Sequence, residues 1–190
     1  MPAAADVQRQ EDFLDRHTER PEFNQYWYSG STISVLVQEI LAAAPCGRVA
    51  FLSTPSLFFS LPEGSAARAN SVLLDFDAVS FGGTAGFAAY DFNAPEELPP
   101  GLAGSFSLVV IDPPFITEPV WRQYARTAAL LLPRGAPPHV IASTVLENAP
   151  LMAELFGAAP VAFRPAIPHL VYHYPPTALV EANPEVPGDD

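Results

Sequence analysis

Short apolar segments alternate along this chain with segments of helical character, and this alternation limits the possible folds more than any other feature. Five runs have the composition of buried strands, and they cover residues 48–53, 71–75, 87–90, 106–111 and 139–143. Helices are predicted over 31–44, with Ser31 or Thr32 as the cap, over 118–132 and over 147–156. The runs 161–163 and 170–174 lie close enough in sequence to pair as a hairpin. This order predicts an α/β domain with a mostly parallel sheet and a C-terminal hairpin.

Length and composition are those of one domain. The chain has 190 residues, of which 49% are hydrophobic, enough for one well-filled α/β core and too little for two. We expect a flexible N-terminal arm over residues 1–22, the folded domain over 23–175 and a disordered acidic tail over 176–190.

The cysteine and histidine pattern argues against a metal site. Cys46 is the single cysteine, which rules out an internal disulfide and a zinc site built from several cysteines, and the four histidines lack an obvious ligand spacing.

No apolar stretch approaches membrane-spanning length, and the first residues lack the features of a secretion signal. We therefore expect a cytoplasmic protein with no membrane association.

The charge disfavours nucleic acid as a partner. The formal net charge is −12, and the 9 basic residues are all arginines, scattered along the chain without a cluster. A protein that binds DNA or RNA normally needs a basic stripe to displace counterions from the phosphates. An acidic chain is instead electrostatically suited to a basic protein partner.

The tetrapeptide Asp112-Pro113-Pro114-Phe115 directly follows the apolar run 106–111. Proline cannot donate to a strand ladder, so the run must end here, and Asp112 lies at the carboxyl end of a strand, where open α/β sheets place their ligands. A carboxylate and the Pro113 carbonyl can accept both N–H bonds of a neutral amine. The segment resembles the D/N-P-P-Y/F motif of S-adenosylmethionine-dependent amino-methyltransferases, although Asp-Pro-Pro is also a common turn.

Further candidates for such a cofactor site follow the other predicted strands. A cofactor of this kind needs a turn near its methionine part, an acid for its ribose hydroxyls and a polar-aromatic pair for its adenine. The turn is Ser53-Thr54-Pro55-Ser56, the acid is Asp75 and the pair is Asp91-Phe92. The turn lacks the glycines that this fold usually carries there.

Four sequence blocks resemble the elongation factor 1A lysine methyltransferase family, whose members were long labelled N6-adenine methyltransferases. The resemblance covers about residues 22–174, and its blocks are Gln25–Ser29, Leu52–Ser56 with Phe59–Pro62, Tyr90–Asn93 and Asp112–Phe115. It implies a seven-stranded Rossmann-like class I methyltransferase fold, S-adenosyl-L-methionine as cofactor and a lysine of elongation factor 1A as substrate. The family's first turn is likewise Ser-x-Pro-Ser rather than glycine-rich.

The resemblance also implies a role for each matching residue. The implied catalytic residues, which orient the target amine, are Asp112, Pro113, Pro114 and Phe115. The implied cofactor-binding residues are Ser53, Thr54, Pro55, Asp75, Asp91 and Phe92. The implied substrate-binding residues are Tyr26, Trp27 and Tyr28, which would cover the cofactor or the substrate lysine. An aromatic trio can equally be a plug that packs the N-terminal arm onto the sheet.

Two other functions stay open from the sequence. An N6-adenine methyltransferase would use Asp112-Pro113-Pro114-Phe115 on a flipped base, and it would need a basic partner subunit because this chain lacks a basic track. A non-catalytic interaction module would keep the fold and bind no cofactor. Its support is that residues 78–83 and 165–170 depart from the family's pattern.

Overall fold

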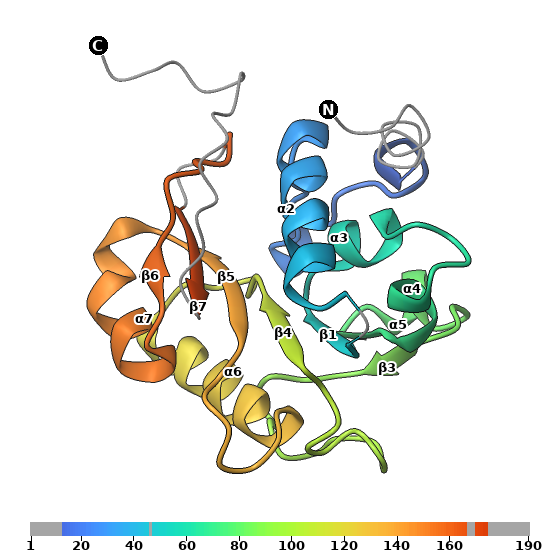
Figure 1. The fold of residues 1–190 in the computed structure, drawn as a ribbon. Coiled ribbons are helices and arrows are strands. Elements are labelled where there is room, and N and C mark those ends of the chain that lie inside the picture. The colour runs from blue at the N-terminus through green and yellow to red at the C-terminus, as the bar shows by residue number, and fades with distance from the viewer. Residues whose placement is uncertain (1–12, 46, 167–169, 175–190) are drawn as a thin grey trace.

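The computed structural model describes residues 13–45, 47–166 and 170–174, which form one α/β domain around a seven-stranded sheet (Figure 1). The strand order is β3-β2-β1-β4-β5-β7-β6. The strands are β1 (Val49–Leu52), β2 (Val72–Asp75), β3 (Phe87–Ala89), β4 (Leu108–Ile111), β5 (Val140–Thr144), β6 (Ala159–Pro160) and β7 (Leu170–Tyr174). The first five pair in parallel, and β7 is antiparallel to both β5 and β6. The predicted mostly parallel, Rossmann-like sheet with a C-terminal hairpin is confirmed.

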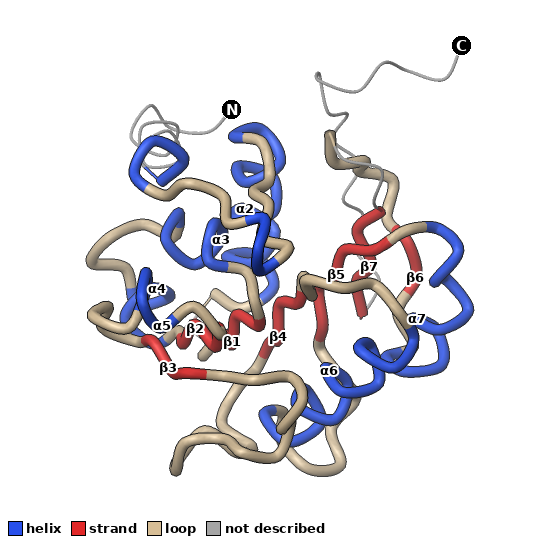
Figure 2. Tube along the Cα trace, turned by 180° about the vertical axis from the view of Figure 1, so that it is seen from behind, coloured by secondary structure: helices blue, strands red, loops and turns tan. Residues whose placement is uncertain are grey.

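Helices cover both faces of this sheet (Figure 2). They are α2 (Gly30–Ala43), α3 (Pro55–Ser60), α4 (Ala66–Asn70), α5 (Ala78–Phe81), α6 (Glu118–Leu131) and α7 (Ala149–Phe156), with short 3-10 turns at Pro21–Phe23 and Leu146–Asn148. Residues of β1 alternate between the two faces: Ala50 and Leu52 pack with Trp121 of α6, whereas Phe51 packs with Ile33 of α2. The central strands are therefore apolar throughout, as expected for a parallel sheet covered on both faces.

Two of the boundaries that differ from the sequence-based expectation are explained by local backbone geometry. Ser29, not Ser31 or Thr32, caps α2, because its side chain accepts a hydrogen bond from the Thr32 N–H while its own backbone is still extended. The last pairing strand before β7 is β6, where 161–163 was expected. It begins earlier because Gly157, at φ 65°, ends α7 and lets the chain extend at once. The pairing does continue at Val161, whose N–H donates to the Val171 carbonyl at 2.8 Å.

Part of the predicted N-terminal arm packs on the domain. Residues 13–16 are helical, and the Phe13 side chain is buried against His17 and Trp27, with ring centroids 4.7 and 5.3 Å away. Residues 1–12 of that arm and the predicted tail over 176–190 lie outside the described residues. Within the part of the chain that the structure describes, no helix has the length and apolar character needed to cross a membrane.

Candidate functional site

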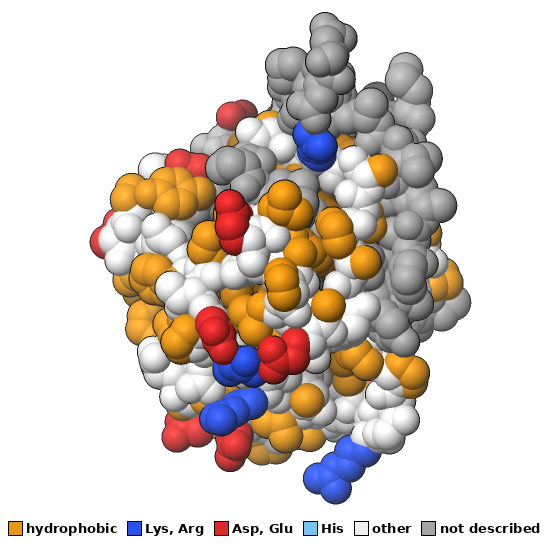
Figure 3. Space-filling view, turned by 90° about the vertical axis from the view of Figure 1, so that its left-hand side faces the viewer, with side chains coloured by type: hydrophobic (Ala, Val, Ile, Leu, Met, Phe, Trp, Pro, Cys, Tyr) orange, Lys and Arg blue, Asp and Glu red, His pale blue; other side chains and the backbone are white. Residues whose placement is uncertain are grey.

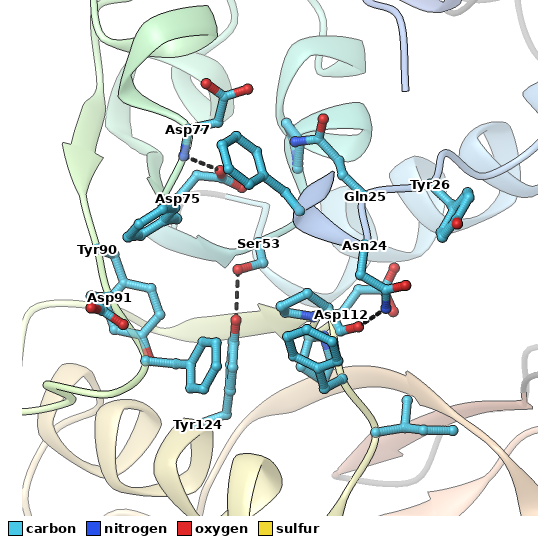
Figure 4. A pocket seen from close by; sticks show the side chains of 18 of the residues that line it. Asn24, Gln25, Tyr26, Ser53, Asp75, Asp77, Tyr90, Asp91, Asp112 and Tyr124 are labelled. Carbon is cyan, nitrogen blue, oxygen red and sulfur yellow. Dashed lines mark hydrogen bonds between the residues drawn. The ribbon is translucent and has the colours of Figure 1, made fainter. Parts of the chain in front are cut away.

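A cavity of about 610 Å³ opens at the carboxyl edge of the sheet, a volume typical of small-molecule sites (Figure 4). Its walls come from the ends of β1, β2 and β4, the loop after β3, the start of α6 and residues 22–28. Parallel strands gather their carboxyl ends at one edge, which is why residues far apart in sequence meet here.

Asp112 stands at the end of β4. Its backbone N–H donates to the Leu52 carbonyl at 3.3 Å, and its Oδ1 accepts the Ser143 hydroxyl at 2.7 Å. The three residues that follow, Pro113 to Phe115, all line the cavity, and Phe115 is 48% exposed at its mouth. The Asn24 side-chain amide donates to the Pro114 carbonyl, so residues 22–28 are tied to this loop (Figure 4).

The turn after β1 uses an unusual backbone conformation. Ser53 lies at φ 55°, in the left-handed region that glycine favours, and its hydroxyl is 2.7 Å from the Tyr124 hydroxyl (Figure 4). Pro55 begins α3 and lines the cavity beside Ser53. Thr54 does not line it: the side chain is buried, and its hydroxyl has no hydrogen-bond partner among the described residues.

Two aspartates at the end of β2 differ in their electrostatics. Asp75 accepts the Asp77 N–H at 2.9 Å, but burial dominates and raises the pKa of Asp75 from 3.8 to about 6. Burial also disfavours the charge on Asp77, yet hydrogen bonds from Ser80 and from the Arg20 guanidinium outweigh it and lower the pKa of Asp77. Both acids line the cavity.

The loop after β3 supplies the predicted adenine pair. Asp91 and Phe92 both line the cavity, with the Asp91 carboxylate accepting the Asn93 N–H at 2.8 Å. The Phe92 ring stacks on Tyr124 with centroids 5.9 Å apart and meets Phe115 edge-on at 6.4 Å. These three rings form an aromatic wall that reaches from the loop after β3 to the Asp112–Phe115 segment.

The aromatic trio before α2 lines the cavity, but its members differ. Tyr26 is 58% exposed at the mouth. Trp27 is held by a residue that does not line the cavity, because its ring N–H donates to the His17 carbonyl at 2.9 Å. Tyr28 is buried, and its hydroxyl lies 2.5 Å from that of Ser143. Tyr28 therefore fits the interpretation as a packing plug, and Tyr26 fits the interpretation as a wall of the site.

The structure thus brings every predicted site residue except Thr54 to one cavity. Lining residues without a predicted role are Glu22, Phe23, Asn24, Gln25, Phe76, Asp77, Tyr90, Asn93, Ile116, Thr117 and Tyr124. Ser143, which contacts Asp112, was also missed. A signal for it existed, because Ser143 is the last residue of the predicted strand 139–143, at the same edge of the sheet as Asp112, which follows the predicted strand 106–111.

The cavity is acidic. Its lining contains four aspartates and Glu22, and no arginine, lysine or histidine among the described residues. On the face viewed in Figure 3, basic side chains are scattered among acidic ones rather than gathered in a stripe. Within the described ranges, no group of three or more His, Cys, Asp or Glu could hold a metal ion. Such a lining suits a cationic ligand and is poorly suited to phosphates.

Comparison with known families and proteins gives consistent results. The profile of the family described as "Probable N6-adenine methyltransferase" matches residues 19–177. EEF1A lysine methyltransferase 1 of Gallus gallus is 37% identical over 112 residues, which are 58% of this chain and 53% of that protein. The Danio rerio protein of the same name is 39% identical over 102 residues, 50% of this chain and 60% of its own length. The Homo sapiens protein is 32% identical over 146 residues, 76% and 66% of the two chains.

The matched part therefore spans between about half and two thirds of these curated relatives. Among solved structures, the branched-chain polyamine synthase from Thermus thermophilus superposes with a TM-score of 0.54 at 18% identity, covering 77% of this chain and 45% of the synthase. At this identity the similarity shows the fold alone.

Proposed function

The chain belongs to the family described as "Probable N6-adenine methyltransferase", and from this premise we propose that it is an S-adenosyl-L-methionine-dependent protein-lysine N-methyltransferase that acts on elongation factor 1A. The observation that carries the proposal is Asp112-Pro113-Pro114-Phe115 at an acidic cavity without basic lining residues. The names of the relatives support a lysine substrate, since the chicken, zebrafish and human proteins are each called EEF1A lysine methyltransferase 1.

The hydrogen-bond acceptors and the aromatic rings of the cavity fit the proposed cofactor. The Asp75 carboxylate can accept hydrogen bonds from the ribose hydroxyls. The Phe92 ring can stack on the adenine, and the Asp91 carboxylate can accept a hydrogen bond from the adenine amine. Ser53 and Pro55 would border the methionine part. An acidic, aromatic lining also suits a sulfonium cation. When bound, S-adenosyl-L-methionine supplies a methyl group that its sulfonium has already activated.

The chain's own contribution is orientation. The Asp112 carboxylate and the Pro113 carbonyl would accept the two N–H bonds of the neutral lysine amine, which directs its lone pair away from them. A free lysine amine is protonated at neutral pH, with a reference pKa of about 10.4, so one proton must leave before transfer. The exposed Phe115 and Tyr26 rings at the mouth offer apolar surface for the methylene stem of the lysine.

An adenine substrate is the second candidate, favoured by the same four residues and by the family's description. The lining argues against it, because nucleic-acid phosphates would approach a cavity lined by four aspartates and a glutamate. A basic partner subunit would be required.

The test is transfer of labelled methyl from S-adenosyl-L-methionine to elongation factor 1A, DNA and RNA in parallel reactions. We expect label on the factor, and we expect Asp112→Ala to abolish it while calorimetry still detects cofactor binding. Glu154→Gln is the matched control, because it removes an exposed carboxylate that pairs with Arg122 between α6 and α7. Label on nucleic acid would promote the second candidate, and absence of both label and cofactor binding would leave only a non-catalytic module.

A further inference from the structure

Three side chains form a continuous hydrogen-bonded chain that ends on the catalytic carboxylate. The Ser143 hydroxyl donates to Asp112 Oδ1 at 2.7 Å, and the Tyr28 and Ser143 hydroxyl oxygens are 2.5 Å apart. Serine has a single hydroxyl hydrogen, which Ser143 gives to Asp112, so Tyr28 must be the donor in the second bond. The proton direction along Tyr28, Ser143 and Asp112 is thereby fixed.

The fold places these residues together for identifiable reasons. Strands β4 and β5 are parallel neighbours with Ile111 opposite Ala142, so Asp112 and Ser143 are the next positions in register. Tyr28 directly precedes Ser29, the N-cap of α2, and the start of that helix therefore sets the direction of the Tyr28 side chain.

Burial strengthens the hydrogen bonds that join Tyr28, Ser143 and Asp112. Tyr28 is 4% exposed and Ser143 is 3% exposed, so water has little access to the bond between their hydroxyls, whereas Asp112 is half-buried because it lines the cavity. Hydrogen bonds are electrostatically stronger in such surroundings than in water, and a carboxylate that accepts one loses rotational freedom. Burial is also the main cause that raises the pKa of Tyr28 well above its usual value, so its hydroxyl keeps the proton that it donates.

We propose that Tyr28 and Ser143 are positioning residues that fix the Asp112 carboxylate in the orientation needed for the target amine. This inference rests on the proposed methyl transfer and deepens it. It also changes the role expected for Tyr28: where the sequence suggested a contact with cofactor or lysine, the hydroxyl acts on the reaction through the Asp112 carboxylate, with which it interacts both by way of Ser143 and electrostatically. Tyr26 keeps the substrate-facing role within the trio.

The test compares Tyr28→Phe and Ser143→Ala with two controls that remove the same groups elsewhere. Tyr172→Phe removes a buried tyrosine hydroxyl that donates to the Val145 carbonyl, and Ser71→Ala removes a buried serine hydroxyl that donates to the Ala67 carbonyl. Neither control residue lines the cavity.

We expect kcat for methyl transfer to elongation factor 1A to fall about 10- to 100-fold in Tyr28→Phe and Ser143→Ala, because small misplacements of catalytic groups have effects of this size. The KM and calorimetric Kd for S-adenosyl-L-methionine should stay at the wild-type values, since neither hydroxyl is proposed to touch the cofactor. The double variant should be little slower than Ser143→Ala, because residues that act as one chain do not have additive effects.

Three outcomes separate the possibilities. Wild-type kcat in Tyr28→Phe and Ser143→Ala, with thermal stability lowered no more than in the controls, would overturn the positioning role and leave the proposed function standing. Fully multiplicative losses in the double variant would also contradict it, because they would mean that the two hydroxyls act independently. No transfer by the wild-type protein to the factor would overturn the proposed function, and the positioning role with it.

Discussion

The raised pKa of Asp75 allows a quantitative prediction about the stability of the protein. Its pKa is raised from 3.8 to about 6 by burial at the end of β2. The folded protein therefore holds a proton on Asp75 more tightly than the unfolded chain does, and the contribution of Asp75 to the free energy of unfolding must fall as pH rises from about 4 to about 6. A difference of about 2 pKa units corresponds to roughly 3 kcal/mol, reached in full above the folded-state value.

Asp75→Asn removes this charge and keeps an oxygen that can accept the Asp77 N–H. Urea unfolding should therefore show the variant to be more stable than wild type at pH 8, by at most about 3 kcal/mol. The gap should shrink as pH falls and close near pH 4. The same variant should bind S-adenosyl-L-methionine more weakly, because the proposed ribose site loses its carboxylate acceptor.

Asp77, two residues further along the chain, provides a control because its pKa is shifted in the opposite direction. Its pKa is lowered because, despite burial, Ser80 and Arg20 stabilise the charged form. An acid of this kind contributes stability that is present at neutral pH and lost as pH falls through its folded-state value. Asp77→Asn should therefore destabilise the protein at pH 7, with the difference closing in acid. Equal destabilisation by Asp75→Asn at every pH would refute the assignment of the Asp75 shift to burial.

Substitutions at three further positions follow from the packing of the site and the core. Ser53→Ala keeps the left-handed backbone at φ 55° and loses the Tyr124 hydrogen bond, so in urea unfolding it should be about 1 kcal/mol less stable than Ser53→Gly, in which the strain is relieved. Asn24→Ala removes the donor to the Pro114 carbonyl, and steady-state kinetics should show a raised KM for the protein substrate with the fold intact. Trp121→Ala empties a fully buried volume between α6 and the sheet, and urea unfolding should show a loss of about 4 kcal/mol. Trp121→Phe should lose much less, because the Trp121 ring N–H has no hydrogen-bond partner among the described residues.

The sequence predicted the parts of the site that depend on strand ends. Asp112 could be placed because Pro113 and Pro114 must stop the preceding strand, and Asp75 because it closes an apolar run. The parallel sheet then brings such positions to one edge, whatever their distance along the chain.

What the sequence could not provide depends on which elements are neighbours. The contact between Ser143 and Asp112 requires β5 to lie beside β4, and the contact with Tyr28 requires the start of α2 to lie over both. No local pattern encodes these pairings.

Local signals were also too weak for some boundaries. Ser29, Ser31 and Thr32 are all competent helix caps, and in the structure it is Ser29 that has the extended backbone and accepts the Thr32 N–H. The short helices α3, α4 and α5 were missed because helices of 6, 5 and 4 residues carry too little periodicity to be recognised.

The most direct test of the proposed function is the Asp112→Ala comparison with labelled cofactor and purified elongation factor 1A. We predict that wild-type protein labels a lysine of the factor, that Glu154→Gln does so equally, and that Asp112→Ala does not while binding S-adenosyl-L-methionine normally. Undiminished labelling of the factor by Asp112→Ala would contradict the role assigned to this carboxylate and, with it, the proposed mechanism.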